Sequence, residues 1–210
     1  MPENSVAILF SGEEQKRSND VEWPFRQSNE VNYFTGSTQR KTSFALIKDG
    51  RTVSTVIFAQ EADIYFETWI GRLPDFDTIK AETGADYVIA DTELTAFMSA
   101  LLNGQAWDTD RSAPPTFPTF YEAVKNGSAS IWFSLGRFRT VGETADTPAS
   151  KFSTHIRSNF PDVRVANISP VINDMREVKS AWELEQLQRA ISITTDAQIA
   201  GMKRIKTADH

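Results

Sequence analysis

Short apolar runs separated by polar turns recur along the first part of the chain. The first run, 5–10, is closed by Ser11-Gly12, which is the pattern of a buried strand that ends in a turn. Two further runs, 42–47 and 52–58, flank the dipeptide Asp49-Gly50. Asp-Gly between β-branched and aromatic runs is the strongest short-range hairpin signal. The pattern therefore predicts one strand followed by a β-hairpin.

Strand-like and helix-like segments then alternate. The segment 94–102 has apolar residues at helical spacing and stops at Asn103-Gly104. Further strands are expected over 86–90, 131–135 and 163–168, and further helices over 117–125 and 149–160. Strands that alternate with helices after an initial hairpin predict an α/β fold, with a mixed β-sheet flanked by helices.

The last element is predicted to be a long helix. A turn is expected at Pro170, and Ser180 with Glu183 then forms a capping box that opens the helix. One stripe carries its apolar residues, which are Leu184, Leu187, Ile191, Met202 and Ile205. At 1.5 Å per residue, a helix of about 25 residues is about 40 Å long. This length favours a connector to another domain, with a terminal helix that docks on its own sheet as the alternative.

Composition and charge exclude several classes of function. The 210 residues carry a net charge of −6 and a pI near 5.0, which argues against a nucleic-acid partner. Cysteine is absent, so disulfides, thiolate zinc sites and cysteine nucleophiles are excluded. We read neither a signal peptide nor a membrane span, so no membrane partner is expected and the cytoplasm is the expected compartment.

The sequence offers little for catalysis. Only His155 and His210 are histidines, and neither a P-loop, a dinucleotide-binding fingerprint nor an H-E-x-x-H zinc motif occurs. Acidic pairs such as Glu61 with Asp63 and Asp75 with Asp77 are better explained as charges at turns and helix starts than as a metal site. We therefore expect neither catalytic residues nor metal ligands in this chain.

Two segments are unusual in their density of aromatic and cationic residues. The segment 23–36, which includes Arg26 and Tyr33, lacks helix or strand periodicity and is expected to be held by side-chain hydrogen bonds and stacking. The segment 67–72 places Trp69 and Arg72 around a glycine, where a loop could present the indole outside the domain. Composition alone favours a core role for Trp69.

Both ends of the chain resemble bacterial Xaa-Pro aminopeptidases of the creatinase/prolidase, or "pita-bread", metallopeptidase family. The family opens with R-S-x-D, [YW]-P-[FY]-R-Q and Y-[FL]-[TS]-G, and the matching stretches here are 17–20, 23–27 and 33–36. The stretch 172–184 resembles the family's interdomain junction, h-x-x-[ML]-R-x-h-K-[ST]-x-x-E-h, where h is an apolar residue. The middle, from about 74 to 161, matches only in element order.

The resemblance implies a domain organisation. Residues 1–174 would form the N-terminal α/β domain, with a ribonuclease-H-like sheet, and 175–210 a linker helix to a catalytic domain. That second domain would bind two divalent metals, typically manganese, through two Asp, one His and two Glu, all beyond this sequence. Family members remove the residue that precedes proline from a peptide. This chain alone would then be inactive and hold no cofactor.

The resemblance also suggests partners and candidate residues. The expected partners are the chain's own catalytic domain and further copies in a dimer or tetramer, with proline-containing peptides as substrates of the parent enzyme. In some bacterial relatives a Trp in a W-x-G-R context reaches a neighbouring subunit's active site, and Trp69 occupies that context here, with Arg72 as its companion. The candidates for a substrate-channel or intersubunit role are Trp69, Arg72, Arg26 and Tyr33.

Two alternatives remain open. A free-standing module of the same fold could bind peptides without cutting them, as pseudo-enzymatic relatives do with peptides or histones. A prolidase or creatinase would share the architecture and differ in substrate. The aromatic-Pro-Phe-Arg-Gln stretch at 23–27 favours the aminopeptidase.

Overall fold

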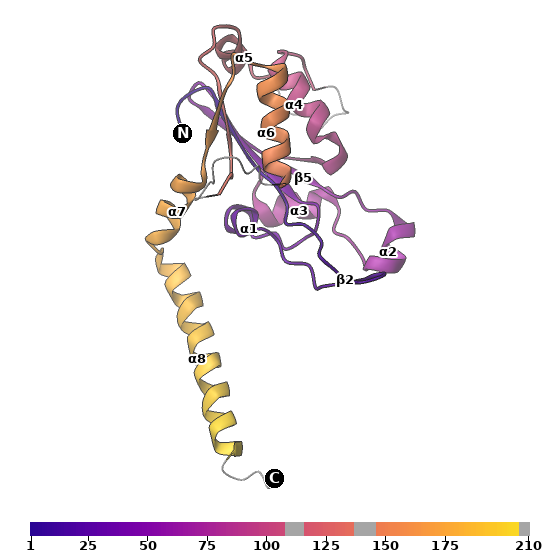
Figure 1. The fold of residues 1–210 in the computed structure, drawn as a ribbon, viewed down its shortest axis with the longest axis vertical. Coiled ribbons are helices and arrows are strands. Elements are labelled where there is room, and N and C mark those ends of the chain that lie inside the picture. Colours follow the sequence, from indigo (N-terminus) through magenta and orange to yellow (C-terminus); the bar gives the residue numbers. More distant parts are fainter. Residues whose placement is uncertain (108–115, 137–145, 206–210) are drawn as a thin grey trace. The chain divides into compact units, whose positions relative to one another are not determined.

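A six-stranded sheet forms the centre of the first of two compact units, residues 1–169 and 170–210. The computed structural model describes residues 1–107, 116–136 and 146–205. The strand order is β6-β5-β4-β1-β7-β8. Figure 1 shows helices α4 and α6 beside the sheet. The strands span Ser5–Leu9 (β1), Ser43–Asp49 (β4), Thr52–Ala59 (β5), Tyr87–Ala90 (β6), Ser130–Phe133 (β7) and Arg164–Asn167 (β8). The predicted mixed α/β fold is confirmed.

The predicted hairpin joins β4 and β5. Asp49 pairs with Thr52, and Gly50 takes the left-handed conformation that the tight turn requires, with φ of 60°. Strand β4 is antiparallel to β1 and β5, whereas the neighbouring pairs β1–β7, β7–β8 and β5–β6 are all parallel. The carboxyl ends of the five strands other than β4 therefore lie at the same end of the sheet. The segment 10–12 leaves β1 at this end.

Helices cover both faces of the sheet. The main core lies on one face, where Ile8 and Phe58 pack in one cluster with Phe97, Phe120 and Ile156. Those last three residues come from α4 (Leu94–Leu102), α5 (Pro118–Lys125) and α6 (Pro148–Asn159), respectively. A 3₁₀ turn at Asp91–Glu93 precedes α4. The opposite face is covered by α1 (Asn29–Thr35) and α3 (Phe76–Thr83). Phe34 of α1 stacks on Phe44 of β4, and α3 contacts β6.

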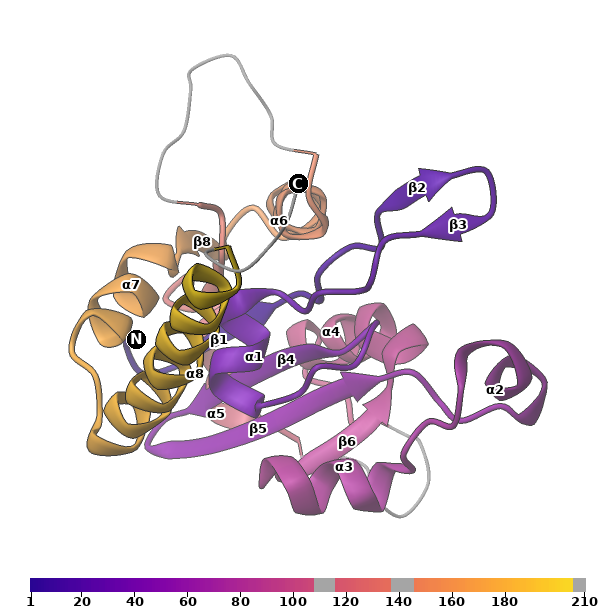
Figure 2. The same cartoon turned by 90° about the horizontal axis from the view of Figure 1, so that it is seen from below.

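The sequence did not predict several short elements. Strands β2 (Lys16–Ser18) and β3 (Val21–Glu22) form a small hairpin that extends from the sheet (Figure 2). All their residues are exposed, so no alternation of buried and exposed positions marks them. Helices α1, α3 and α2 (Ile64–Ile70) were also missed, and each buries two residues or fewer among those described.

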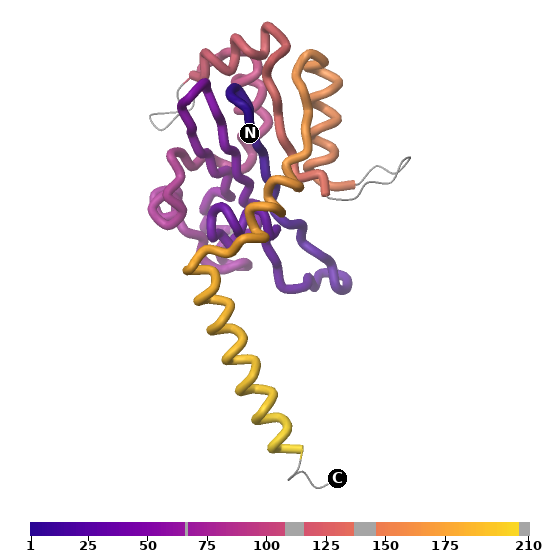
Figure 3. The backbone as a smooth tube through the Cα atoms, turned by 90° about the vertical axis from the view of Figure 1, so that its left-hand side faces the viewer, coloured from indigo at the N-terminus to yellow at the C-terminus, as the bar shows by residue number. Residues whose placement is uncertain are grey.

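The second unit is helical. Helix α7 (Ser169–Glu177) replaces the turn expected at Pro170, because proline is tolerated in the first turn of a helix. Helix α8 (Ala181–Ile205) has 25 residues, as predicted, and runs as one continuous coil (Figure 3). No residue of α8 is buried. The expected domain boundary after residue 174 stays a prediction.

Candidate functional site

Helix α2 carries the most exposed group of apolar side chains in the first unit. The Asp63 carboxylate caps the helix by accepting the backbone N–H of Tyr65 at 2.8 Å, and Gly71 ends it with φ of 86°. Ile64 and Trp69 are 85% and 78% exposed. The core role that composition favoured for Trp69 is therefore wrong, and so is its placement in a loop, because it lies in the last turn of a helix.

The segment after α2 places Arg72 beside carboxylates. An open hollow of about 590 Å³ is lined by Ala62, Glu67, Arg72, Leu73, Pro74, Asp75 and Thr78. The Thr78 hydroxyl and backbone N–H, and to a smaller extent the Arg72 charge, hold the pKa of Asp75 below its usual value. Trp69 and Arg72 thus come from one helix end and the loop that follows it.

The other two candidates lie around α1. Arg26 is exposed, and its guanidinium donates a long hydrogen bond of 3.4 Å to the side-chain oxygen of Asn29. Tyr33 is half-buried, with its ring edge-on to Phe34 at 5.3 Å. Arg26 precedes α1 and Tyr33 lies in it, whereas Trp69 lies in α2 and Arg72 follows that helix. Two of the four candidates thus belong to the α1 region and two to the α2 region.

Gln27, next to Arg26, is the residue on which the α1 region depends. It is 7% exposed, and its Oε1 accepts the backbone N–H groups of Gly12 at 2.8 Å and Ser28 at 2.7 Å. Its Nε2 donates to the backbone oxygens of Gln39 at 2.6 Å and Thr42 at 3.5 Å. A buried amide with both ends satisfied fixes three chain segments together. Sequence reasoning noted Gln27 only within a motif and missed this role.

Stacking and an ion pair hold the β2–β3 hairpin. Arg17 lies 4.9 Å from the Trp23 ring, and Arg40 lies 6.0 Å from the Phe25 ring. Arg40 also pairs with Glu14 at 2.6 Å. The expectation that side-chain hydrogen bonds and stacking hold the segment 23–36 is confirmed by these contacts and by Gln27.

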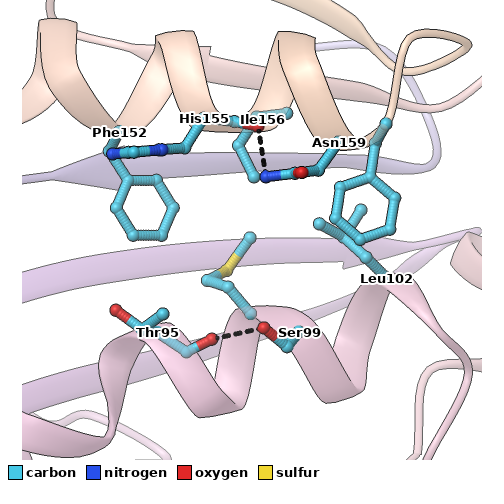
Figure 4. A pocket seen from close by; sticks show the side chains of 9 residues that line it. Thr95, Ser99, Leu102, Phe152, His155, Ile156 and Asn159 are labelled. Atoms are coloured by element: carbon cyan, nitrogen blue, oxygen red, sulfur yellow. Dashed lines mark hydrogen bonds between the residues drawn. The ribbon is translucent and has the colours of Figure 1, made fainter.

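A second hollow, of about 300 Å³, lies between α4 and α6. Figure 4 shows Phe152 and His155 from α6 facing Thr95 and Ser99 from α4 across it. The polar side chains at its rim are bound locally, since Ser99 donates to the Thr95 carbonyl and Asn159 to the His155 carbonyl. Its floor is apolar, so it has the character of a gap between two packed helices.

The described residues lack a metal centre. Residues 1–107, 116–136 and 146–205 contain no group of three or more His, Asp or Glu side chains that could hold a metal ion. Asp63 and Asp75 cap helices, as expected for these acidic pairs. His155 is exposed, and His210 lies outside the described residues. None of the helices in the described part of the chain is both long enough and apolar enough to cross a membrane.

Comparison with known proteins gives consistent matches. The family model for the aminopeptidase P N-terminal domain matches residues 1–108. The Xaa-Pro aminopeptidase of Escherichia coli K12 is 26% identical over 208 residues, which is 98% of this chain and 42% of the relative. The chain thus spans about two fifths of that relative's length.

Solved structures agree in fold. Escherichia coli aminopeptidase P with the inhibitor Pro-Leu has a TM-score of 0.70 at 27% identity, and the match covers 94% of this chain and 40% of that one. Proline aminopeptidase P II from Yersinia pestis has a TM-score of 0.70 at 23% identity, covering 96% and 42%. At this lower identity the likeness shows the fold alone.

Proposed function

Because the chain belongs to the family of aminopeptidase P N-terminal domains, we propose that it serves a metal-dependent Xaa-Pro aminopeptidase as its non-catalytic N-terminal part. The observation that carries this proposal is the alignment of nearly all of this chain with about two fifths of a known Xaa-Pro aminopeptidase. The catalytic domain would be the chain's first partner, and peptides with proline in the second position would be the parent's substrates.

Helix α8 supports a connecting role. Its exposed apolar side chains include Leu184, Leu187, Ile191, Met202 and Ile205, which share one face. Apolar side chains on a helix face are stabilised when another element covers them. A catalytic domain that packs against this face would supply the cover.

The metals of the parent enzyme find no fitting site among the residues that the structure describes. Two-metal hydrolysis needs several carboxylate and imidazole ligands that converge on both ions. The described acidic residues do not converge in this way, and Asp63 and Asp75 use their carboxylates to cap helices. We therefore assign the two divalent ions, manganese by family resemblance, to the catalytic domain, and derive no step through them here.

The role left for this domain is assembly and shaping of the substrate channel. Trp69 and Arg72 offer an aromatic face and a cation at an exposed helix end, which suits contact with a neighbouring subunit or a bound peptide. Arg26 and Tyr33 are weaker candidates, because Arg26 bonds locally and Tyr33 is half-buried against Phe34. A dimer or tetramer in the cytoplasm is the working form that we propose.

One comparison of two proteins tests the function. The complete gene product should cleave Xaa-Pro peptides in a manganese-dependent reaction, and residues 1–210 alone should neither cleave them nor bind manganese tightly by calorimetry. Manganese-dependent cleavage by the 210 residues alone would contradict the proposal, and so would an inactive complete product that binds peptides.

A second comparison tests the channel role. Trp69→Ala in the complete product should lower kcat/KM or weaken assembly, measured by sedimentation. Ile64→Ala removes another exposed apolar side chain, from the start of the same helix, and serves as the matched control. Equal effects of the two substitutions would contradict a specific role for Trp69.

A further inference from the structure

Glu67 differs from its neighbours on α2. It is partly buried, whereas Ile64, Tyr65, Thr68 and Trp69 are exposed. Among the α2 side chains that the structure describes, the most buried is therefore a carboxylate, where a helix that packs on a core would bury an apolar residue.

The bonds of Glu67 close the turn that follows the helix. Its carboxylate Oε1 accepts the backbone N–H of Leu73 at 2.8 Å. Its backbone oxygen accepts the N–H of Gly71 at 3.0 Å. The main chain and the side chain of one residue thus hold both ends of the segment 71–73, which contains Arg72.

The turn needs such a restraint. Gly71 has φ of 86° and ψ of 169°, a conformation that favours glycine, and a glycine restricts its own backbone less than any other residue does. Arg72 is exposed and cannot fix the turn by burial. Without the bond from Glu67 to Leu73, the last turn of α2 and the loop after it would sample several orientations, and Trp69 and Arg72 would move with them.

We propose that Glu67 is a positioning residue, whose carboxylate fixes the 71–73 turn and so holds Trp69 and Arg72 in the orientation in which they meet the substrate channel or a neighbouring subunit. This inference rests on the channel role proposed above for Trp69 and Arg72. Glu67 itself touches neither the peptide nor the metals in this proposal.

The first test uses residues 1–210 and amide exchange by NMR. Glu67→Ala should speed exchange of the Leu73 amide roughly tenfold, since one accepted hydrogen bond is lost. Glu67→Gln keeps an oxygen acceptor and should restore most of the protection. Thr68→Ala, which removes a hydroxyl bonded only to the Ile64 carbonyl, is the matched control on the same helix. Unchanged Leu73 exchange in Glu67→Ala overturns the proposal.

The second test uses the complete gene product and steady-state kinetics. Glu67→Ala should raise KM for an Xaa-Pro peptide about threefold to tenfold with a smaller change in kcat, and Glu67→Gln should rescue it. The loss in the double variant Glu67→Ala/Trp69→Ala should be smaller than the sum of the two single losses, because part of the effect of Glu67 passes through the indole.

The outcomes separate the two proposals. Full additivity of Glu67→Ala and Trp69→Ala overturns the positioning role, even when the channel role of Trp69 holds. A failure of both Trp69→Ala and Arg72→Ala to change turnover or assembly contradicts the proposed channel role itself. A drop in melting temperature that matches the loss of activity in Glu67→Ala, with no rescue by Glu67→Gln, reduces Glu67 to a structural residue and also overturns the proposal.

Discussion

The carboxylate of Glu183 accepts hydrogen bonds from both the backbone N–H and the hydroxyl of Ser180, at 2.8 and 2.7 Å. In return, the Ser180 hydroxyl oxygen accepts the backbone N–H of Glu183 at 3.3 Å. The reciprocal bonds confirm the predicted capping box at the start of α8. Ser180→Ala should cost about 1 kcal/mol of helix stability through loss of the cap. Amide exchange in the first turn of α8 measures the change.

A matched control exists within the same helix. Ser192 lies in the middle of α8, where its hydroxyl only donates to the Gln188 carbonyl. Ser192→Ala should therefore leave the first turn of α8 unchanged. Equal exchange rates in Ser180→Ala and the unsubstituted chain would show that the cap does not hold the helix start.

Two helix starts should weaken in acid. Hydrogen bonds from Ser180 lower the pKa of Glu183, and hydrogen bonds from Thr78 lower the pKa of Asp75 at the start of α3. A carboxylate whose pKa is lower in the folded state stabilises the protein above its unfolded pKa, and this stability is lost as the pH falls through the folded pKa. The carboxyl ¹³C chemical shifts, followed by NMR as the pH is lowered, should give a pKa below the ordinary 4.5 for Glu183 and below the ordinary 3.8 for Asp75.

The variant Asp75→Asn separates the cap from the charge. Asparagine can accept the Thr78 N–H in the same position but does not titrate in this range. The acid-induced fraying of α3 should therefore become smaller in Asp75→Asn. Identical acid profiles of the two proteins would contradict the role assigned to Asp75.

Replacement of Gln27 should be among the most damaging changes in the first unit. Gln27→Ala removes the partners of the Gly12 and Ser28 N–H groups and of the Gln39 carbonyl. Leaving these groups without partners should lower the free energy of unfolding by about 2–3 kcal/mol, measured by urea denaturation.

Gln27→Glu gives this prediction a pH dependence. A carboxylate can still accept the two N–H groups, but it cannot donate to the Gln39 carbonyl and repels it. Burial and the Gln39 carbonyl should disfavour the charged form more than the two N–H groups favour it, so the folded state should raise the pKa of the new carboxyl group. The variant should be most stable at low pH, relative to the unsubstituted chain, and should lose that stability as the pH rises through the raised pKa. A pH-independent difference would contradict the hydrogen-bond assignment.

Two glycines should respond to alanine with opposite signs. A Cβ on Gly12 would lie 2.5 Å from the Arg26 carbonyl oxygen, so Gly12→Ala forces the backbone to shift and should cost about 1–3 kcal/mol. Gly201 lies in α8 with nothing within 4 Å of its Cβ position, so Gly201→Ala should stabilise the helix by about 1 kcal/mol. Urea denaturation and α8 amide exchange measure the two effects.

The sequence predicted the elements that bury a regular pattern of side chains. The β4–β5 hairpin follows from its Asp-Gly turn, and α4 from apolar residues such as Phe97 and Leu101 on one face. Helix α3 buries only Ile79 among its described residues, so no apolar stripe marks it. Its start was recognised only as a charged pair, of which Asp75 proves to be the cap.

The candidate site was predicted less well than the fold. The sequence singled out Trp69 and Arg72, and the structure places them at one helix end, but their function stays a prediction. The sequence marks Glu67 only as part of the segment 67–72, because its bond to Leu73 depends on a turn conformation that residue types do not specify. Gln27 was missed for the same reason, since its partners are backbone groups from distant segments.

The position of β1 also sets when this domain can fold during synthesis. Val6 and Ile8 pair on one side with β4 and on the other with Ile131 and Phe133 of β7, so the first strand made is central in the finished sheet. A nascent chain that has left the ribosome only as far as residue 108 would present an unpaired apolar edge. We expect such a chain to depend on a chaperone until the later strands emerge.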